Sequence, residues 1–438
     1  MSSVQQRILD MIRCFRKEWR LYSDSERTTV CSIDSMLVAL QLSVAEVNKK
    51  NHGDFNASLS EVVLSWNYFL LDKLAILHKN MEAPENYVDI KIAYDNFLRC
   101  CNMLDLIDIY KKWRAVSLEN ESISSVSTYI LGIHLCNSFS SFSYLQSPIT
   151  SNIGREIFLK TSKNKMLYAY LSLLANSKND LAFAYILNIP DRGLGREAFT
   201  DLKHAARKRQ MSIFQMATSF IRTIELGGKG YAPSSDDPLR THVKGLSQFI
   251  HFMDKLEEII GEIPDPRLAG GRILSTIKMH LIKGRNSKDP FCQAAEEVVK
   301  DLDLRIKNIK NFQHEAMAAN STGISPARPK VHSINHGTAY CGRDTVKSLL
   351  ALLDEAAASP PPNSKAQLLF GEEFGFPSTI LLFRSPVQSS GASPKALRQR
   401  IEIAAREREP KLKQPLIRSQ FACTYKDDPD NSIKESAL

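Results

Sequence analysis

The sequence contains no run of about 18 apolar residues, the length that a helix needs to cross a membrane. A membrane-spanning segment is therefore not expected. It also contains no C-x-x-C pair among its eight cysteines, which argues against a zinc ribbon and against a secreted disulfide framework. His332, His336 and Cys341 stand close together, but no second cysteine pair accompanies them, so we expect no metal site and no cofactor.

The nucleotide-binding motif G-x-x-x-x-G-K-[ST] is absent as well, so no segment is expected to cradle the phosphates of ATP. The glycine-rich run at residues 227–230 lacks the spacing of that loop and the Ser/Thr that binds magnesium. ATP hydrolysis requires the phosphate and metal ligands together. We therefore expect a protein that is not an enzyme and has no catalytic residues.

The composition is that of an ordinary soluble globular protein. The chain has 438 residues, of which 43% are hydrophobic and 24% are charged, enough to bury a core in two or three domains. Its formal net charge of +9 favours an anionic partner, and nucleic acid is the common one. Many soluble proteins are equally basic without such a partner, so charge alone leaves both interpretations open.

Apolar residues recur at helical spacing through most of the chain, which predicts a mainly α fold. Early helices are expected at residues 4–19, 35–47, 59–78 and 88–113. Later breaks are expected at Pro190 and at residues 227–230, 233–238 and 264–271. We expect six segments in order: an N-terminal helical domain at 1–116, a serine-rich connector at 117–164, a second helical domain at 165–312, a linker at 313–338, a helix at 339–358, and a mostly disordered basic tail at 359–438.

Residues 186–206 carry the most specific local pattern. A helix is expected to end near Asn188, because Pro190 blocks its continuation. Residues 193–195, Gly-Leu-Gly, then form a tight hairpin, and a second helix begins directly after it. This layout is a helix–hairpin–helix, in which glycines without a Cβ let a phosphate backbone approach closely. Unpaired N–H groups at the start of the second helix attract an anion.

The second helix supports this interpretation with charge. At about 100° per residue, Arg196, Lys203 and Arg207 fall in one narrow stripe, opposite an apolar face. Such contacts to phosphate position a protein without reading base sequence. A turn between two packed helices with a solvated basic face is the alternative. The predicted DNA-binding residues are Arg192, Gly193, Leu194, Gly195, Arg196, Lys203 and Arg207, with Leu194 expected to hold the hairpin in the core.

Two stretches resemble UvrD-type superfamily 1 DNA helicases. Residues 166–206, through Tyr170, Asn176 and the glycine hairpin, are similar to the start of the inserted accessory subdomain, and residues 94–108 to the end of the first one. The resemblance implies helical accessory subdomains and a hairpin that touches duplex DNA. Because the nucleotide motif is missing, it does not extend to the ATP-driven motor.

The chain as a whole, to about residue 428, resembles the PCNA-interacting partner family, whose members are also called PCNA-associated recombination inhibitors. The resemblance rests on residues 25–29, 186–206, 221–232, 334–344 and 417–428. It implies a regulator of DNA repair that suppresses inappropriate homologous recombination at replication forks. The implied partners are DNA, the sliding clamp PCNA, the strand-exchange recombinase and poly(ADP-ribose) polymerase. The implied location is the nucleus, also the cytoplasm, with chromatin association during replication or damage.

The clamp-binding box of that family, Q-x-x-[ILM]-x-x-[FY]-[FY], is matched only in part. Gln414, Ile417 and Phe421 fit, but Gln420 stands in the first aromatic place. Losing one aromatic should weaken the anchor by about 1–3 kcal/mol. We expect weak or no clamp binding from this chain, which ends at Leu438 without a full box, as a shortened form would.

Three functional interpretations remain from the sequence: a DNA-binding regulator, a protein-interaction scaffold that does not bind DNA, and an active ATP-dependent helicase. One apolar segment near the tail is also open. Residues 380–383, Ile-Leu-Leu-Phe, could add as a strand to the sheet edge of a partner or could pack on the folded body.

Overall fold

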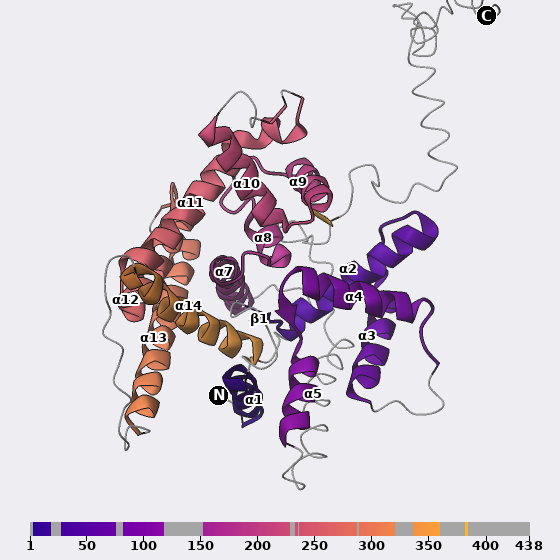
Figure 1. The fold of residues 1–438 in the computed structure, drawn as a ribbon, viewed down its shortest axis with the longest axis horizontal. Helices are drawn as coiled ribbons and strands as arrows, with labels where there is room; N and C mark the ends of the chain where they lie inside the picture. The colour runs from indigo at the N-terminus through magenta and orange to yellow at the C-terminus, as the bar shows by residue number, and fades with distance from the viewer. Residues whose placement is uncertain are drawn as a thin grey trace, which may run out of the picture. The chain divides into compact units, whose positions relative to one another are not determined.

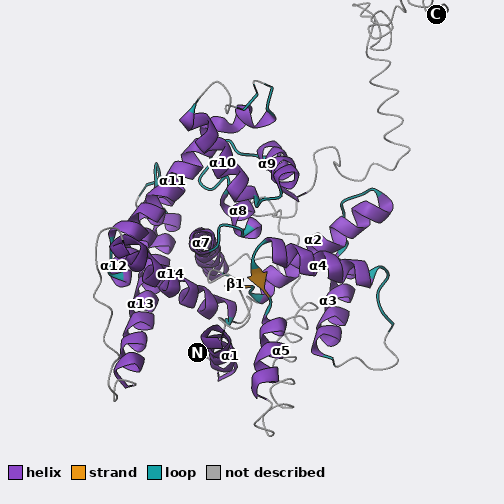
Figure 2. Cartoon of the chain, viewed as in Figure 1, coloured by secondary structure: helices purple, strands orange, loops and turns teal. Residues whose placement is uncertain are grey.

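The computed structural model describes residues 3–18, 28–75, 82–117, 152–227, 233–234, 236–286, 289–319, 336–359 and 382–383. These residues form a mainly helical structure, as the sequence predicts (Figure 1). In the described part of the chain the only strands are β1 (Thr29–Val30) and β2 (Met103–Leu104), which pair in parallel (Figure 2). No helix there is long and apolar enough to span a bilayer.

The N-terminal part contains five helices among the described residues. Ser32 caps one of them and Ser58 another, and Ser58 forms a capping box with Glu61, as expected where a serine precedes an apolar helical run. The helices are α1 (Ser3–Glu18), α2 (Ile33–His52), α3 (Leu59–Leu74), α4 (Tyr87–Cys100) and α5 (Leu106–Ser117).

The prediction of one helix at residues 88–113 is wrong, because a turn and a strand divide it. Asn102 has a left-handed backbone with φ of 51°, and β2 follows it to pair with β1. Asp105 then starts α5, its Oδ1 accepting from the N–H of Asp108 at 2.8 Å. Periodicity continued across this break because Met103, Leu106 and Ile107 are all buried.

The second part begins earlier than expected. Helix α7 starts at Asn152, inside the range predicted as a connector, and residues 118–151 lie outside the described part. The elements that follow in chain order are α7 (Asn152–Ala175), α8 (Asp180–Ile186), α9 (Arg196–Arg209), α10 (Ile213–Leu226), η3 (Pro238–His242), α11 (Val243–Glu262), α12 (Pro266–Ile282), α13 (Pro290–Ala319) and α14 (His336–Ala357).

Two further boundaries differ from expectation. The break predicted at residues 264–271 is shorter, since Asp265 caps α12 and Gly270 and Gly271 lie inside that helix. A Cβ on Gly270 would lie 2.9 Å from Ile306 Cδ1, so the glycine serves close packing of α12 on α13. The linker predicted at 313–338 is also narrower, because α13 continues to Ala319 and α14 starts at His336.

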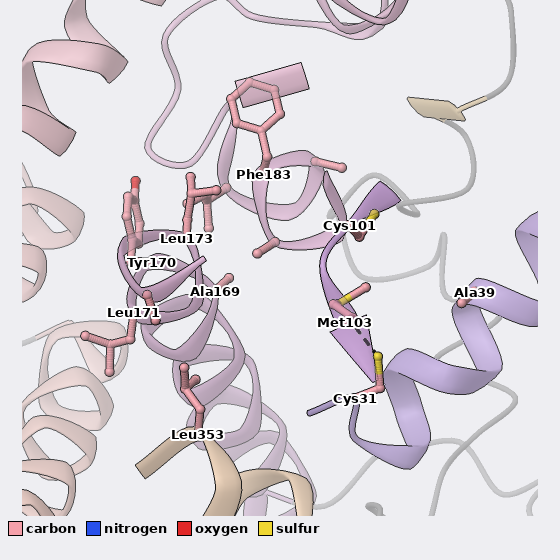
Figure 3. Packing of buried hydrophobic residues seen from close by; sticks show 14 of the residues in the cluster. Cys31, Ala39, Cys101, Met103, Ala169, Tyr170, Leu171, Leu173, Phe183 and Leu353 are labelled. Atoms are coloured by element: carbon pink, nitrogen blue, oxygen red, sulfur yellow. Dashed lines mark hydrogen bonds between the residues drawn. The ribbon is translucent and has the colours of Figure 1, made fainter. Parts of the chain in front are cut away.

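Helix α7 lies at the centre of the part that starts at Asn152. Helices α8, α11, α12, α13 and α14 pack against it. Its residues Tyr170, Leu171 and Leu173 are buried, with Phe183 of α8 close by (Figure 3). At the end of α7, Asn176 Nδ2 donates to Thr29 Oγ1 at 3.0 Å and to the Cys101 carbonyl at 2.9 Å. The amide of Asn176 therefore joins this core to the β1–β2 pair.

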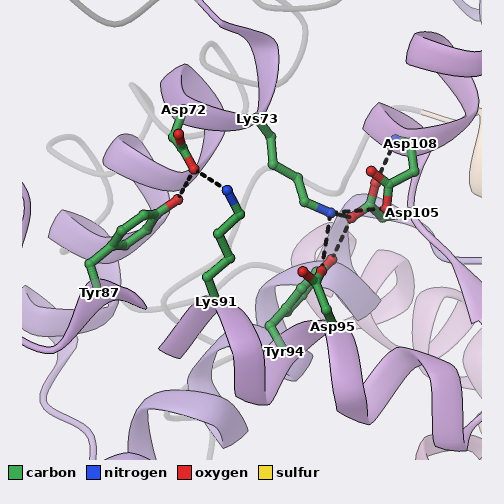
Figure 4. A network of polar contacts seen from close by, with 8 residues as sticks. All are labelled: Asp72, Lys73, Tyr87, Lys91, Tyr94, Asp95, Asp105 and Asp108. Carbon is green, nitrogen blue, oxygen red and sulfur yellow. Dashed lines mark hydrogen bonds and ion pairs between the residues drawn. The ribbon is translucent and has the colours of Figure 1, made fainter. Parts of the chain in front are cut away.

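A buried ion network fixes α3 against α5 (Figure 4). Lys73 Nζ lies 2.7 Å from Asp105 Oδ2 and 2.9 Å from Asp108 Oδ2, and its side chain is 4% exposed. Burial opposes the charge on Lys73, but the two carboxylates raise its pKa above the ordinary value. Tyr94 donates to Asp105 as well, at 3.2 Å, so the buried carboxylate is paired and hydrogen-bonded, and loss of one partner would leave a buried charge uncompensated.

Candidate nucleic-acid interface

The hairpin predicted between α8 and α9 is present and is organised by one side chain. Asn188 Oδ1 accepts from the N–H groups of Arg192 at 2.8 Å and Leu194 at 2.9 Å. The N–H of Gly193 donates to Asp191 Oδ1 at 3.0 Å. Gly193 has φ of 69°, a left-handed backbone that favours glycine. The turn is therefore defined by Asn188 and Asp191 together with Gly193.

Leu194 holds the hairpin in the core, as expected. Its side chain is 2% exposed and packs over Gly245 of α11. A Cβ on Gly245 would lie 2.7 Å from Leu194 Cγ and 2.6 Å from the Arg192 carbonyl oxygen, so only glycine admits this contact. The side chain of Leu194 is thus an anchor, and the prediction that it contacts DNA must be limited to its backbone.

Arg192 requires a correction, because its side chain points into the body and not toward solvent. Nη2 donates to the Tyr170 hydroxyl at 2.8 Å, and the guanidinium lies 5.0 Å from the centre of the Phe249 ring. Nη1 faces three main-chain carbonyls, those of Ile186, Leu187 and Pro190. With these acceptors engaged, the side chain of Arg192 fixes the hairpin and does not face the open surface at the start of α9.

A neutral histidine completes the setting of Arg192. His280 Nε2 lies 3.0 Å from Arg192 Nη2, and its ring stacks on Phe252 with 3.8 Å between centroids. Burial and the adjacent guanidinium lower the pKa of His280 to about 4. The imidazole is therefore neutral at pH 7 and accepts a hydrogen bond from Arg192.

Gly193 and Gly195 are the residues of the hairpin that are exposed at the surface with free space around them. Both are exposed, and a Cβ on either one would meet nothing within 4 Å. Gly195 has φ of −81°, which any residue can adopt, so neither space nor backbone angle demands glycine there. It occupies the N-cap of α9 without a side chain to cap the helix. The helix therefore begins at an open, uncapped surface.

Only part of the basic stripe on α9 faces solvent, because α2 lies next to it. Arg207 is 66% exposed, and its Nη2 lies 3.6 Å from Glu46 Oε1. Lys203 is half-buried, and its Nζ donates to the carbonyl oxygen of Phe383. Burial and then the neighbouring Lys49 and Arg207 lower the pKa of Lys203 to about 8.

The electrostatic neighbours of Lys203 define one basic cluster, which consists of Lys49, Arg196, Lys203 and Arg207. Lys49 lies in the last turn of α2 and was not predicted, because no local pattern links it to α9. Burial lowers the pKa of Lys203 most, and the cations lower it further through mutual repulsion, which an incoming anion would relieve. The predicted clamp-binding residues Gln414, Ile417 and Phe421 lie outside the described part of the chain.

Residues 2–138 match the family model described as the PCNA-interacting partner N-terminal domain. The human protein named PCNA-interacting partner is 58% identical over 434 residues, covering 97% of this chain and 75% of that protein. The chain belongs to the PCNA-interacting partner family. The bovine member is 56% identical over 436 residues, covering 97% of this chain and 75% of its own length.

The helicase resemblance has a narrower basis than family membership. DNA helicase II of Salmonella typhimurium is 24% identical over 107 residues, which covers 24% of this chain and 13% of that protein. This likeness covers a short part of the chain and shows similarity there and no more. It does not extend over most of the helicase.

Proposed function

We propose that this chain is a non-catalytic, DNA-binding regulator of DNA repair that interacts with PCNA and suppresses inappropriate homologous recombination at replication forks. The observation that carries the DNA-binding part is the placement of Gly193 and Gly195, open and exposed, at the start of α9. The basic cluster lies along the same helix and across from it on α2.

The physical reason is that these features satisfy different needs of a phosphate. An uncapped helix N-terminus supplies N–H donors and a partial positive charge. Glycines allow the sugar–phosphate backbone to approach the main chain without contacting a Cβ. The basic cluster adds full charges, of which Arg207 is the most accessible with 66% of its side chain exposed. Contacts of this kind hold DNA without reading its sequence.

The PCNA part is supported by the name of the relatives, PCNA-interacting partner. The sequence at residues 414–421 offers a partial box for the contact, with Ile417 and Phe421 as its apolar anchors. Calorimetric titration of this chain into PCNA, with Phe421→Ala beside it, tests that assignment. A loss of affinity in the variant supports the box, and equal affinities would assign the contact to another segment. No binding by the parent chain would contradict the PCNA part of the proposal.

The remaining elements follow from family membership and from the missing nucleotide motif. Contact with the strand-exchange recombinase, an association with poly(ADP-ribose) polymerase, and nuclear action on chromatin, with a cytoplasmic pool, belong to the proposal. The chain is proposed to work as an adaptor without a cofactor, because no phosphate-binding loop occurs in its sequence. DNA-stimulated ATP hydrolysis by the purified protein would contradict this part and favour a helicase.

The DNA-binding part is tested by the salt dependence of binding to a duplex oligonucleotide. The affinity for DNA falls with salt, and each phosphate neutralised by a side chain makes the slope of log K against log salt steeper by about 0.9. Arg207→Ala should therefore make this slope shallower by about 1. Lys300→Ala is the matched control, because Lys300 is 73% exposed on α13, away from the hairpin. Equal slopes for both variants would remove α9 from the interface, and no affinity at low salt would favour a scaffold that does not bind DNA.

A further inference from the structure

Two residues from far along the chain, Leu382 and Phe383, are buried against the folded body beside α9 (Figure 1). The Phe383 ring meets the Phe199 ring edge-on, with 4.9 Å between centroids, and the Phe97 ring edge-on at 6.2 Å. Phe199 belongs to α9 and Phe97 to α4, so Phe383 is seated between helices of both expected domains. Packing on the body is therefore the role that Leu382 and Phe383 take.

The same contact covers the ammonium group of Lys203. Its Nζ donates to the main-chain carbonyl oxygen of Phe383, and the side chain is half-buried. A carbonyl is a neutral acceptor, so it adds no negative charge to the basic cluster, which has the Glu46 carboxylate 3.6 Å from Arg207 as an acidic neighbour. Burial and the nearby cations Lys49 and Arg207 accordingly lower the pKa of Lys203 to about 8. A phosphate oxygen would be the stronger partner, because charge-assisted hydrogen bonds exceed neutral ones.

We propose that Leu382–Phe383 and nucleic-acid phosphate compete for the α9 surface, so that docking of this dipeptide restrains DNA binding. The inference rests on the proposed DNA-binding function of the basic cluster. With the dipeptide seated, Lys203 Nζ is engaged and Phe383 lies over Phe199. With the dipeptide released, Lys203 joins Arg196 and Arg207 in facing a phosphate. Leu382–Phe383 would thus compete with phosphate for α9 from within the same chain.

The structure itself contains the competing segment, because Phe383 lies against Phe199 and Lys203 of α9. Phe199 is 0% exposed and Phe383 is 9% exposed, so the seated ring completes the apolar end of α9. The polar end of the contact is the bond from Lys203. The described part of this contact consists of two residues, two ring pairs and one hydrogen bond, a small area compared with a protein interface.

The test uses the full chain with Phe383→Ala and a fluorescent duplex oligonucleotide, followed by anisotropy at fixed salt. If docking holds most molecules in the covered state, the variant should bind about 3–10-fold more tightly, since the apparent affinity scales with the competent fraction. Phe370→Ala, which removes a ring from the same stretch of sequence, should bind like the parent. Phe383→Leu keeps apolar bulk and should fall between the parent and Phe383→Ala.

A double variant separates competition from a general change in the protein. On a Lys203→Ala background, Phe383→Ala should bring no further gain, because the group that is released is already missing. An equal gain with and without Lys203 would overturn the proposal. Circular dichroism of each variant checks that the helices are retained.

A second measurement reports docking without DNA. Labelling of lysine amines, read by mass spectrometry, should rise at Lys203 in Phe383→Ala and stay constant at the exposed Lys208. Unchanged labelling of Lys203 would overturn the docked state. Increased labelling with unchanged DNA affinity would show docking without competition and would overturn the inference. If no variant binds DNA while labelling still rises, the proposed function fails and the docking contact stands on its own.

Discussion

Arg192 donates from Nη2 to the hydroxyl oxygen of Tyr170 across 2.8 Å, which ties the glycine hairpin to α7. The most conspicuous cation of the hairpin motif is therefore an internal support. The residues left to meet a phosphate are Gly193, Gly195 and the basic cluster. This separation of supporting and contacting residues makes the two roles distinguishable by mutation.

Arg192→Ala should lower the free energy of unfolding by about 2–4 kcal/mol, because buried acceptors lose their donor. Arg192→Lys should recover little, since an ammonium cannot span carbonyls, a hydroxyl and an imidazole together. Urea unfolding followed by circular dichroism measures the loss. Arg207→Ala is the surface control and should stay within about 0.5 kcal/mol of the parent. Equal stabilities for the Arg192 and Arg207 variants would contradict the structural role.

Lys73→Met should destabilise the N-terminal part by about 3–5 kcal/mol, because it leaves Asp105 buried with an uncompensated charge. Asp105 is 0% exposed, so water cannot replace the lost partner. Lys91→Met is the matched control, since Lys91 pairs with Asp72 at 2.6 Å but is 38% exposed. That control should cost about 1 kcal/mol or less. A smaller loss for Lys73 than for Lys91 in urea unfolding would refute the assignment.

Asp180 predicts a dependence of stability on pH. Burial raises the pKa of its carboxyl from 3.8 to about 7, against a hydrogen bond from the Ile213 N–H that lowers it. Because the folded-state pKa is raised, the stabilisation is complete below the unfolded value and is lost as the pH rises through about 7. Asp180→Asn keeps an acceptor for Ile213 but does not titrate.

Between pH 4 and pH 8 the parent should therefore lose about 1–3 kcal/mol relative to Asp180→Asn. Thermal or urea unfolding at several pH values in this range measures the difference in free energy of unfolding between the parent and Asp180→Asn. The test is whether this difference changes with pH, since a difference that is the same at every pH has other causes. Asp191→Asn, at an exposed position in the hairpin, serves as the comparison: it retains Asp180 and should lose stability with pH as the parent does. Parallel curves for parent and Asp180→Asn would show that Asp180 is ionised at little cost.

The sequence predicts local features well where they depend on neighbouring residues. The turn after Asn188 and the burial of Leu194 follow from a proline, two glycines and one apolar residue between them. The direction of Arg192 could not be foreseen, because helical periodicity does not apply inside a hairpin and two of its side-chain partners, Tyr170 and His280, come from α7 and α12. Lys49 was missed for the same reason, since its approach to α9 is purely tertiary.

The predicted helix boundaries were wrong where the same sequence pattern is compatible with two structures. Gly270 and Gly271 predicted a break, but glycine also permits close helix packing, here against Ile306 and Asp303. Apolar spacing predicted one helix through residues 88–113, yet the same buried residues serve a turn and a strand. Phe383 gave no sign of its partner, because its contact with Phe199 joins distant parts of the sequence.

Gly195 offers the most direct test of DNA binding at the hairpin. Asn and Asp are equally good N-cap residues, so Gly195→Asn and Gly195→Asp should each keep or raise stability by about a few tenths of a kcal/mol. The two side chains are nearly equal in size and differ in charge. Both would stand where a phosphate is proposed to approach the start of α9.

The decisive measurement is the affinity of Gly195→Asp and Gly195→Asn for the same duplex oligonucleotide at low salt. Both variants should bind more weakly than the parent, and Gly195→Asp should bind at least about tenfold more weakly than Gly195→Asn, as one added charge facing a phosphate implies. The gap should narrow as salt is raised. Equal affinities for parent, Gly195→Asn and Gly195→Asp would contradict the claim that this hairpin holds DNA.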